Sequence, residues 1–271
     1  MNPSRVRITD FRQRKQRGEK LVLLTAYDAT MARLFDHAGV DALLVGDSLG
    51  TVILGHDTTI PVTLDAILHH TRAVTRGANR ALVVADMPFL TYQVSVAEAV
   101  RNAGRLLQEG GAAAVKLEGG RAVIDAVSRL VEVGIPVMGH LGLLPQSVHA
   151  IGGHRRRPMH AADVDTLIAD AHALEHAGAF AVVLEAVPAD VATTVTAAIG
   201  IPTIGIGAGP GCDGQILVSY DMLGLFDEFV PSFVKQYARL ADTILEATQA
   251  FAGDVRAGRF PQPAVASTPT R

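Results

Sequence analysis

The stretch ALLVGDS (residues 42–48) is an apolar run that ends on two polar residues, Asp47 and Ser48. Burying an ionised side chain costs several kcal/mol unless it is paired or bound to a metal, so a buried strand gains nothing from such an ending. Four later runs end in the same way. Their polar residues are Asp86 in ALVVADM, Lys116 and Glu118 in AAVKLEGG, His140 in IPVMGHLG and Glu185 in AFAVVLEA. We expect these side chains to converge on one site.

Eight strand-like runs alternate with helix-like patterns along the chain. The pattern predicts an α/β protein, a (β/α)8 TIM barrel, which gathers the C-terminal ends of its strands at one face. A doubly wound sheet has similar alternation, but its functional residues gather at a switch point rather than on consecutive strands. The predicted strands cover residues 21–27, 42–48, 81–87, 113–119, 135–142, 179–186, 201–209 and 215–225.

Several helix boundaries are also expected from the sequence. A helix should run from about Thr63 to Arg76, and Ser95 with Glu98 forms a capping box that opens another. Residues 231–258 should form one long closing helix. We expect residues 1–271 to form a single barrel domain, with a short N-terminal extension and a disordered tail from about residue 260.

Bulk properties exclude several classes of protein. The length of 271 residues is close to the roughly 250 typical of a single barrel. A net charge of −3 gives no electrostatic case for nucleic acid as a partner. The sequence contains no uninterrupted apolar run of ~18 residues, so we expect no membrane span. The N-terminus lacks the apolar core of a secretory signal. With Cys212 as the single cysteine, no disulfide can form within the chain, so we expect a cytoplasmic protein.

Asp47, Asp86 and Glu118 end three consecutive predicted strands, which are neighbours in a barrel. Hard oxygen ligands without a nearby cysteine suit Mg²⁺, which keeps several waters and takes one or two direct carboxylates. One of the three can therefore bind through water. The alternative is that each acid caps a helix or pairs with an arginine.

Three further residues extend this site. Lys116 and Glu118 lie on the same strand face, where a cation suits an anionic substrate oxygen; the alternative is a structural salt bridge. Glu185, in the apolar mouth, is suited to a general base, unless it pairs with one of the arginines at 155–157. His140 can be an acid or base, a donor to substrate, or a residue that only positions others.

Two literal motif matches carry little weight. Gly46–Gly50 reads G-x-S-x-G, but a nucleophile elbow leads directly into a helix, and the β-branched residues that follow argue against one. Gly209–Gly214 reads G-x-G-x-x-G, but the dinucleotide fingerprint also needs a helix next, and ILVSYDML does not have that pattern. We interpret this second segment as a turn or a backbone cradle.

The chain resembles the ketopantoate hydroxymethyltransferase family over about residues 9–252. The resemblance rests on LLTAYD, LLVGDSLG, DMPF, VKLEGG, MGHLGLLPQ, LEAVP and GIGAG, in this order. It implies a barrel of the phosphoenolpyruvate/pyruvate type, a homodecamer, Mg²⁺ as cofactor, and 3-methyl-2-oxobutanoate and 5,10-methylenetetrahydrofolate as substrates. The implied metal residues are Asp47, Asp86 and Glu118, the substrate-binding residues are Asp47, Ser48, Asp86, Lys116 and His140, and the proton acceptor is Glu185.

The resemblance also implies a reaction, in which Glu185 removes the C3 proton of the 2-oxoacid and a Mg²⁺-stabilised enolate attacks the one-carbon donor. The product, ketopantoate, leads to pantothenate and coenzyme A. The chain departs from the family pattern at residues 154–158, which affects the expected lid or folate contact, and at Tyr220. Two other functions stay open: a Mg²⁺-dependent C–C lyase or mutase of the same barrel type, and a non-catalytic barrel that serves assembly or binding.

Overall fold

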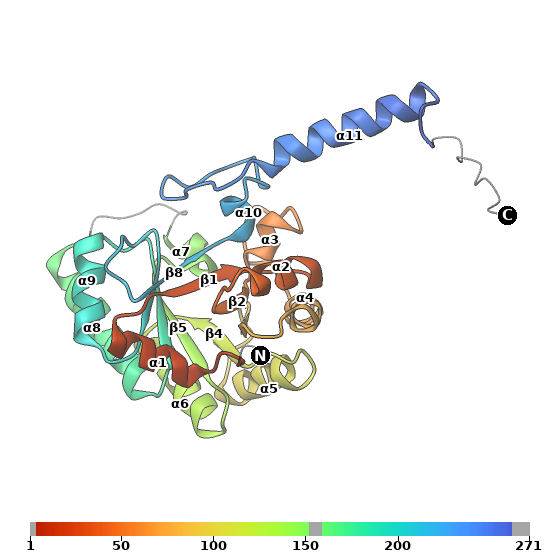
Figure 1. The fold of residues 1–271 in the computed structure, drawn as a ribbon. Coiled ribbons are helices and arrows are strands. Elements are labelled where there is room, and N and C mark those ends of the chain that lie inside the picture. Colours follow the sequence, from red (N-terminus) through yellow and green to blue (C-terminus); the bar gives the residue numbers. More distant parts are fainter. Residues whose placement is uncertain (1–3, 152–158, 262–271) are drawn as a thin grey trace. The chain divides into compact units, whose positions relative to one another are not determined.

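The computed structural model describes residues 4–151 and 159–261, and its centre is a closed barrel of eight parallel strands in sequence order (Figure 1). Each strand pairs with its neighbours along the chain, and β8 pairs with β1 to close the ring. The predicted TIM barrel is therefore confirmed. The strands are β1 (Leu21–Thr25), β2 (Ala42–Val45), β3 (Leu82–Asp86), β4 (Ala114–Glu118), β5 (Val137–Gly142), β6 (Ala181–Glu185), β7 (Thr203–Ile206) and β8 (Gly214–Leu217).

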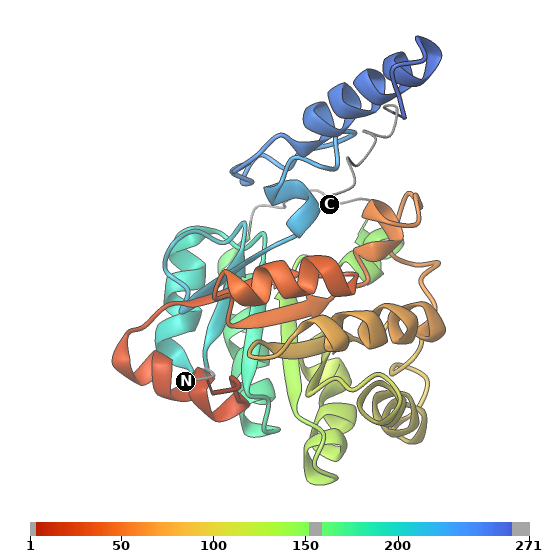
Figure 2. The ribbon, with the colours of Figure 1, turned by 45° about the vertical axis from the view of Figure 1, so that its right-hand side comes forward.

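Helices surround the barrel, as the two ribbon views show (Figures 1 and 2). Asp28, Thr63 and Ser95 each accept a hydrogen bond from a backbone N–H of the first turn, so three of these helices begin at the expected kind of residue. The helices of the barrel unit are α1 (Ile8–Arg17), α2 (Ala29–His37), α3 (Leu49–Val52), α4 (Leu64–Gly77), α5 (Val96–Gln108), η1 (Arg121–Val123), α6 (Ile124–Glu132), η2 (Pro145–Ser147), α7 (Val148–Ile151), α8 (Ala161–His176) and α9 (Ala189–Ala198).

The barrel interior is filled by alternate residues of the strands. Val84 of β3, Met138 of β5 and Val183 of β6 all belong to one buried apolar cluster. Side chains two residues apart on a strand share a face. Asp86, His140 and Glu185 are each two residues further along these strands, so they point toward the barrel axis at its C-terminal end.

The N-terminal extension is partly helical and packs against the other end of the barrel. Phe11 of α1 is fully buried in the interior cluster and meets Phe180 edge to face at 5.3 Å. Lys15 donates to the carbonyl of Ile201, just before β7, and lies 3.0 Å from Asp213, just before β8. Helix α1 therefore covers the N-terminal ends of the strands and leaves the C-terminal ends open.

The predicted eighth strand was too long. β8 ends at Leu217, and residues Ser219–Met222 form a short helix, α10. The Ser219 backbone N–H donates to the Thr25 hydroxyl, which turns the chain away from the sheet. Residues 218–225 therefore do not continue the strand.

The chain from Tyr220 onward forms a second compact unit. Its helix α11 spans Leu240–Arg256, so the prediction of one helix over 231–258 was wrong for the first nine residues. The Tyr237 backbone N–H bonds to Met222 instead of to its own segment. The single-domain prediction stays a prediction, and most of the predicted tail, residues 262–271, lies outside the described residues. No helix of the described chain is long and apolar enough to cross a membrane.

Candidate active site

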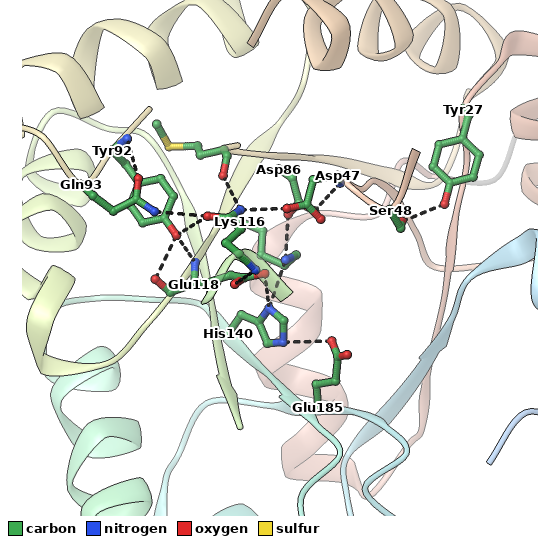
Figure 3. A network of polar contacts seen from close by, with 12 residues as sticks. Tyr27, Asp47, Ser48, Asp86, Tyr92, Gln93, Lys116, Glu118, His140 and Glu185 are labelled. Carbon is green, nitrogen blue, oxygen red and sulfur yellow. Dashed lines mark hydrogen bonds and ion pairs between the residues drawn. The ribbon is translucent and has the colours of Figure 1, made fainter. Parts of the chain in front are cut away.

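A cavity of about 110 Å³ opens at the C-terminal end of the barrel. All of the predicted site residues line it, although they come from four strands and one loop. They are Asp47, Ser48, Asp86, Lys116, Glu118, His140 and Glu185. Figure 3 shows how these side chains point toward one another. The convergence expected from the strand endings is therefore present in the fold.

Lys116 and Asp86 form a buried ion pair in the site. The two residues are register partners on β4 and β3, and Lys116 Nζ lies 2.9 Å from Asp86 Oδ1. Both side chains are at most 5% exposed. Burial opposes the charge on Lys116, but the surrounding carboxylates outweigh it and raise its pKa. Lys116 is therefore a permanent buried cation facing the cavity.

His140 connects the buried cluster to the mouth of the cavity. Its Nδ1 atom lies 3.4 Å from Glu118 Oε1 and 3.3 Å from Lys116 Nζ, and its Nε2 atom lies 3.2 Å from Glu185 Oε2. The Glu185 side chain is 21% exposed, against 3% for His140. Glu185 is thus the carboxylate of the cluster that solvent and an incoming ligand reach first.

Gly142 allows Glu185 to take this place. Its φ of +95° is a conformation that side chains with a Cβ rarely adopt, and a Cβ would lie 2.3 Å from the Glu185 carbonyl oxygen. The Leu143 backbone N–H donates to the same carbonyl. Gly142, the last residue of the predicted strand 135–142, therefore allows the close backbone approach that positions Glu185.

An excess of carboxylates dominates the electrostatics of the site. Burial raises the pKa of Asp47 to about 8, and repulsion from Asp86 and Glu118 adds to the effect. Burial lowers the pKa of His140, but the adjoining Glu118 and Glu185 carboxylates outweigh this and raise it to about 9. Near neutral pH, Asp47 and His140 therefore keep protons that the same groups would lose in water. An added cation would replace these protons and stabilise the cluster.

No group of three or more His, Cys, Asp or Glu side chains within residues 4–151 and 159–261 forms a ready metal cluster. Asp47, Asp86 and Glu118 nonetheless line one cavity, and Glu118 Oε1 makes no hydrogen bond there beyond its 3.4 Å contact with His140 Nδ1. A buried carboxylate oxygen without a hydrogen bond is costly. A site with one or two direct carboxylates plus water, which is what Mg²⁺ prefers, is compatible with this arrangement.

The sequence did not indicate several polar residues of the site. Gln146, in η2, donates to Asp47, and Tyr92 bonds to both Gln146 and Glu118. The Thr59 hydroxyl lines the cavity and has no hydrogen-bond partner among the described residues. None of these three ends an apolar run, so the pattern that found the other residues could not find them.

The two rejected motifs have different outcomes. The expectation that no helix follows Ser48 was wrong, because α3 begins at Leu49. The serine of a nucleophile elbow would bond to a histidine. The Ser48 hydroxyl bonds instead to the Tyr27 hydroxyl, at 2.9 Å. The Gly209–Gly214 segment leads into β8, so the absence of a following helix is confirmed there. The arginines 155–157 lie outside the described residues.

The barrel is similar in fold to solved structures of the PEP mutase/isocitrate lyase superfamily. A 2,3-dimethylmalate lyase of that superfamily matches with a TM-score of 0.60 at 17% identity, over 97% of this chain and 92% of that one. A phosphonopyruvate hydrolase in complex with oxalate and Mg²⁺ matches with a TM-score of 0.62 at 12% identity, over 96% and 91%. At these identities the likeness concerns the fold alone.

The comparisons of amino-acid sequence identify the family of the chain more closely than the fold does. The family model described as ketopantoate hydroxymethyltransferase matches residues 5–263. The 3-methyl-2-oxobutanoate hydroxymethyltransferase of Moorella thermoacetica is 57% identical over 258 residues, covering 95% of this chain and 96% of the relative. The protein of the same name from Syntrophus aciditrophicus is also 57% identical, over 93% and 92%. The chain belongs to the ketopantoate hydroxymethyltransferase family, and the prediction of an enzyme of this family is confirmed.

Proposed function

We propose that this enzyme transfers a one-carbon unit from 5,10-methylenetetrahydrofolate to C3 of 3-methyl-2-oxobutanoate and releases ketopantoate. The observation that carries the proposal is the contact between Glu185 Oε2 and His140 Nε2, at 3.2 Å, beside a buried cluster of acids and Lys116. A reachable base next to a site for an anion is what removal of a proton from a 2-oxoacid requires. The names of the relatives at 57% identity support the same reaction.

The donor set supports Mg²⁺ as the cofactor. Asp47 and Asp86 would hold the ion, and Glu118 would hold it directly or through water. Glu118 Oε1 makes no hydrogen bond and the pKa of Asp47 is raised, and a cation relieves both. When bound, Mg²⁺ supplies positive charge that favours the enolate form of the substrate.

Lys116 and Ser48 would orient the 2-oxoacid. The Lys116 ammonium group faces the cavity beside Asp86 and offers an anionic oxygen a buried positive charge. Negative charge grows on the substrate oxygens as the C3 proton leaves. The ammonium therefore stabilises the transition state more than the bound substrate, which is the condition for faster chemistry.

Glu185 would accept the C3 proton. Its carboxylate is at the mouth of the cavity, and His140 Nε2 lies beside one of its oxygens. His140 thereby orients the carboxylate and leaves the other oxygen for the substrate. Apolar side chains of β6, β7 and β8 line the same cavity, which keeps bulk water from competing for that oxygen.

The rival lyase or mutase function has weaker support. Solved structures with lyase or mutase titles share 15–21% identity with this chain, which concerns the fold alone. A purely structural barrel would have no reason to bury three carboxylates around one lysine. The resemblance further implies a role in pantothenate biosynthesis, a cytoplasmic location and a homodecamer, and these stay predictions.

The direct test is an assay of the purified full-length protein with 3-methyl-2-oxobutanoate, 5,10-methylenetetrahydrofolate and Mg²⁺. We expect ketopantoate to form, and we expect chelation of the metal with EDTA to stop it. Product should be absent when the folate is left out. A protein that cleaves or rearranges 2-oxoacids without folate, and makes no ketopantoate with it, would contradict the proposal.

The metal-free protein should become less stable as the pH rises from about 6.5 to 8. Asp47 has a folded pKa of about 8 against an ordinary 3.8, and His140 has about 9 against 6.5. In this window the folded state keeps two protons that the unfolded chain has released, so raising the pH favours unfolding. Each such proton changes the stability by about 1.4 kcal/mol per pH unit.

Thermal unfolding followed by circular dichroism measures this dependence. With EDTA present, the melting temperature should fall by several degrees across the window, and Asp47→Asn should flatten the fall. Saturating Mg²⁺ should flatten it in the unsubstituted protein. A metal-free melting temperature that rises or stays constant from pH 6.5 to 8 would show that the cluster does not hold these protons.

A further inference from the structure

We infer that Gln146 is a positioning residue that holds the carboxylates of Asp47 and Glu118 in the orientation that binds the divalent cation. This inference rests on the proposed function, because it concerns the same site. Gln146 lies in η2, in the loop after β5, and is 5% exposed. It reaches the ends of three other strands at once.

The side-chain amide of Gln146 makes two donor contacts. Its Nε2 atom donates to Asp47 Oδ2 at 2.8 Å and to the Met87 carbonyl at 3.0 Å. Asp47 follows β2 and Met87 follows β3, so one amide group joins the loops that leave two neighbouring strands. Once a bound cation ionises Asp47, its hydrogen bond with Gln146 is among the stronger ones in proteins, because one partner is charged.

The amide orientation is determined by what surrounds the carbonyl oxygen. Gln146 Oε1 accepts from the Tyr92 hydroxyl at 2.9 Å and from Gln93 Nε2 at 3.2 Å. A flipped amide would put its oxygen against Asp47 Oδ2 and the Met87 carbonyl, and would bring its NH₂ group against the donor Gln93. Both sides of the amide therefore favour the orientation in which it donates to Asp47.

The backbone of Gln146 holds the second carboxylate. Its N–H donates to Glu118 Oε2 at 3.1 Å, and the Tyr92 hydroxyl accepts from the Glu118 backbone N–H at 3.1 Å. The other oxygen, Glu118 Oε1, makes no hydrogen bond within the described chain, and its nearest polar contact is His140 Nδ1 at 3.4 Å. One oxygen of Glu118 is thus held by the Gln146 backbone, while the other faces His140 and can still accept a ligand.

This arrangement has a consequence for cation binding. Partners that hydrogen-bond to ligating carboxylates fix their orientation, and losing one typically costs about 10–100-fold in metal affinity. Without the Gln146 amide, Asp47 is free to turn within a cluster that already repels it. The affinity for Mg²⁺ should therefore fall although no ligand has been changed.

The test is Gln146→Met in the full-length protein, because methionine keeps the unbranched shape and the backbone N–H but removes the amide. Isothermal titration with MgCl₂, without substrate, should give a Kd at least tenfold above that of the unsubstituted protein. Gln215→Met is the matched control: Gln215 is exposed on β8, does not line the cavity, and donates only to the Gly209 carbonyl among the bonds described. Its Kd should be unchanged.

Tyr92→Phe provides a second, milder variant. It leaves Gln146 in place but removes the hydroxyl that orients the amide, so the Kd for Mg²⁺ should rise by a smaller factor. Because Tyr92 acts partly through Gln146, the double variant should lose less affinity than the product of the two single losses. A general loss of structure would not produce this non-additivity.

Circular dichroism shows whether each variant is folded, so that a change in Kd is not mistaken for a loss of structure. If Gln146→Met does not fold, the Kd of Tyr92→Phe alone tests the inference. A Kd within twofold of the unsubstituted protein in every folded variant overturns the inference. An unsubstituted protein that does not bind Mg²⁺ overturns the proposed metal site and the inference together. Tight Mg²⁺ binding by the unsubstituted protein and unaltered binding by Gln146→Met overturns the inference alone.

Discussion

Glu185→Gln is expected to reduce the exchange of the C3 proton of 3-methyl-2-oxobutanoate with D₂O by about 10²–10⁴-fold, the usual contribution of a positioned general base. The amide keeps the size of the side chain but cannot take up a proton. Binding of the 2-oxoacid should change only a few-fold, because the Lys116 and Asp86 ion pair is not disturbed. Proton NMR of the C3 signal, without folate, measures the exchange directly.

Glu132→Gln is the matched control for this substitution. Glu132 lies at the end of α6 and its side chain is 69% exposed, so the exchange rate should equal that of the unsubstituted protein. Unaltered exchange in Glu185→Gln would show that another group takes the proton. His140 would then be the next residue to test, since its Nε2 lies beside the same carboxylate.

Lys116→Met is expected to weaken binding of 3-methyl-2-oxobutanoate by about 100-fold and to cost about 3–5 kcal/mol of stability, because it leaves a buried charge without its partner. The stability loss should be largest without metal, when Asp86 has no other cation beside it. Calorimetric titration measures the binding, and urea unfolding followed by circular dichroism measures the stability.

Lys15→Met separates the two effects. Lys15 also forms a largely buried ion pair, with Asp213 at 3.0 Å, but it does so at the N-terminal ends of the strands. Its loss should reduce stability without changing the affinity for the 2-oxoacid. Equal affinities in Lys116→Met and Lys15→Met would mean that Lys116 serves the fold and not the ligand.

The placement of four strand-end residues could be predicted because it depends on local geometry. Lys116 and Glu118 share a strand face because side chains two residues apart point the same way. Met138 and Val183 point into the barrel, so His140 and Glu185, two residues further on, do the same. A closed ring of parallel strands then brings these endings together whatever the details of the loops. The same local reasoning wrongly extended the eighth strand over residues 218–225, because the apolar pattern continues there. In the structure Ser219 bonds to Thr25 and begins a short helix.

The barrel, the residues that end its strands and the family of the chain could therefore all be read from the amino-acid sequence. The contacts among those residues depend on the folded chain. The bond between Gln146 and Asp47 joins positions 99 residues apart, and the Tyr27–Ser48 contact joins the segments that follow β1 and β2. No periodicity along the chain relates such positions, because their distance is set by the closure of the barrel and not by the repeat of a strand or helix.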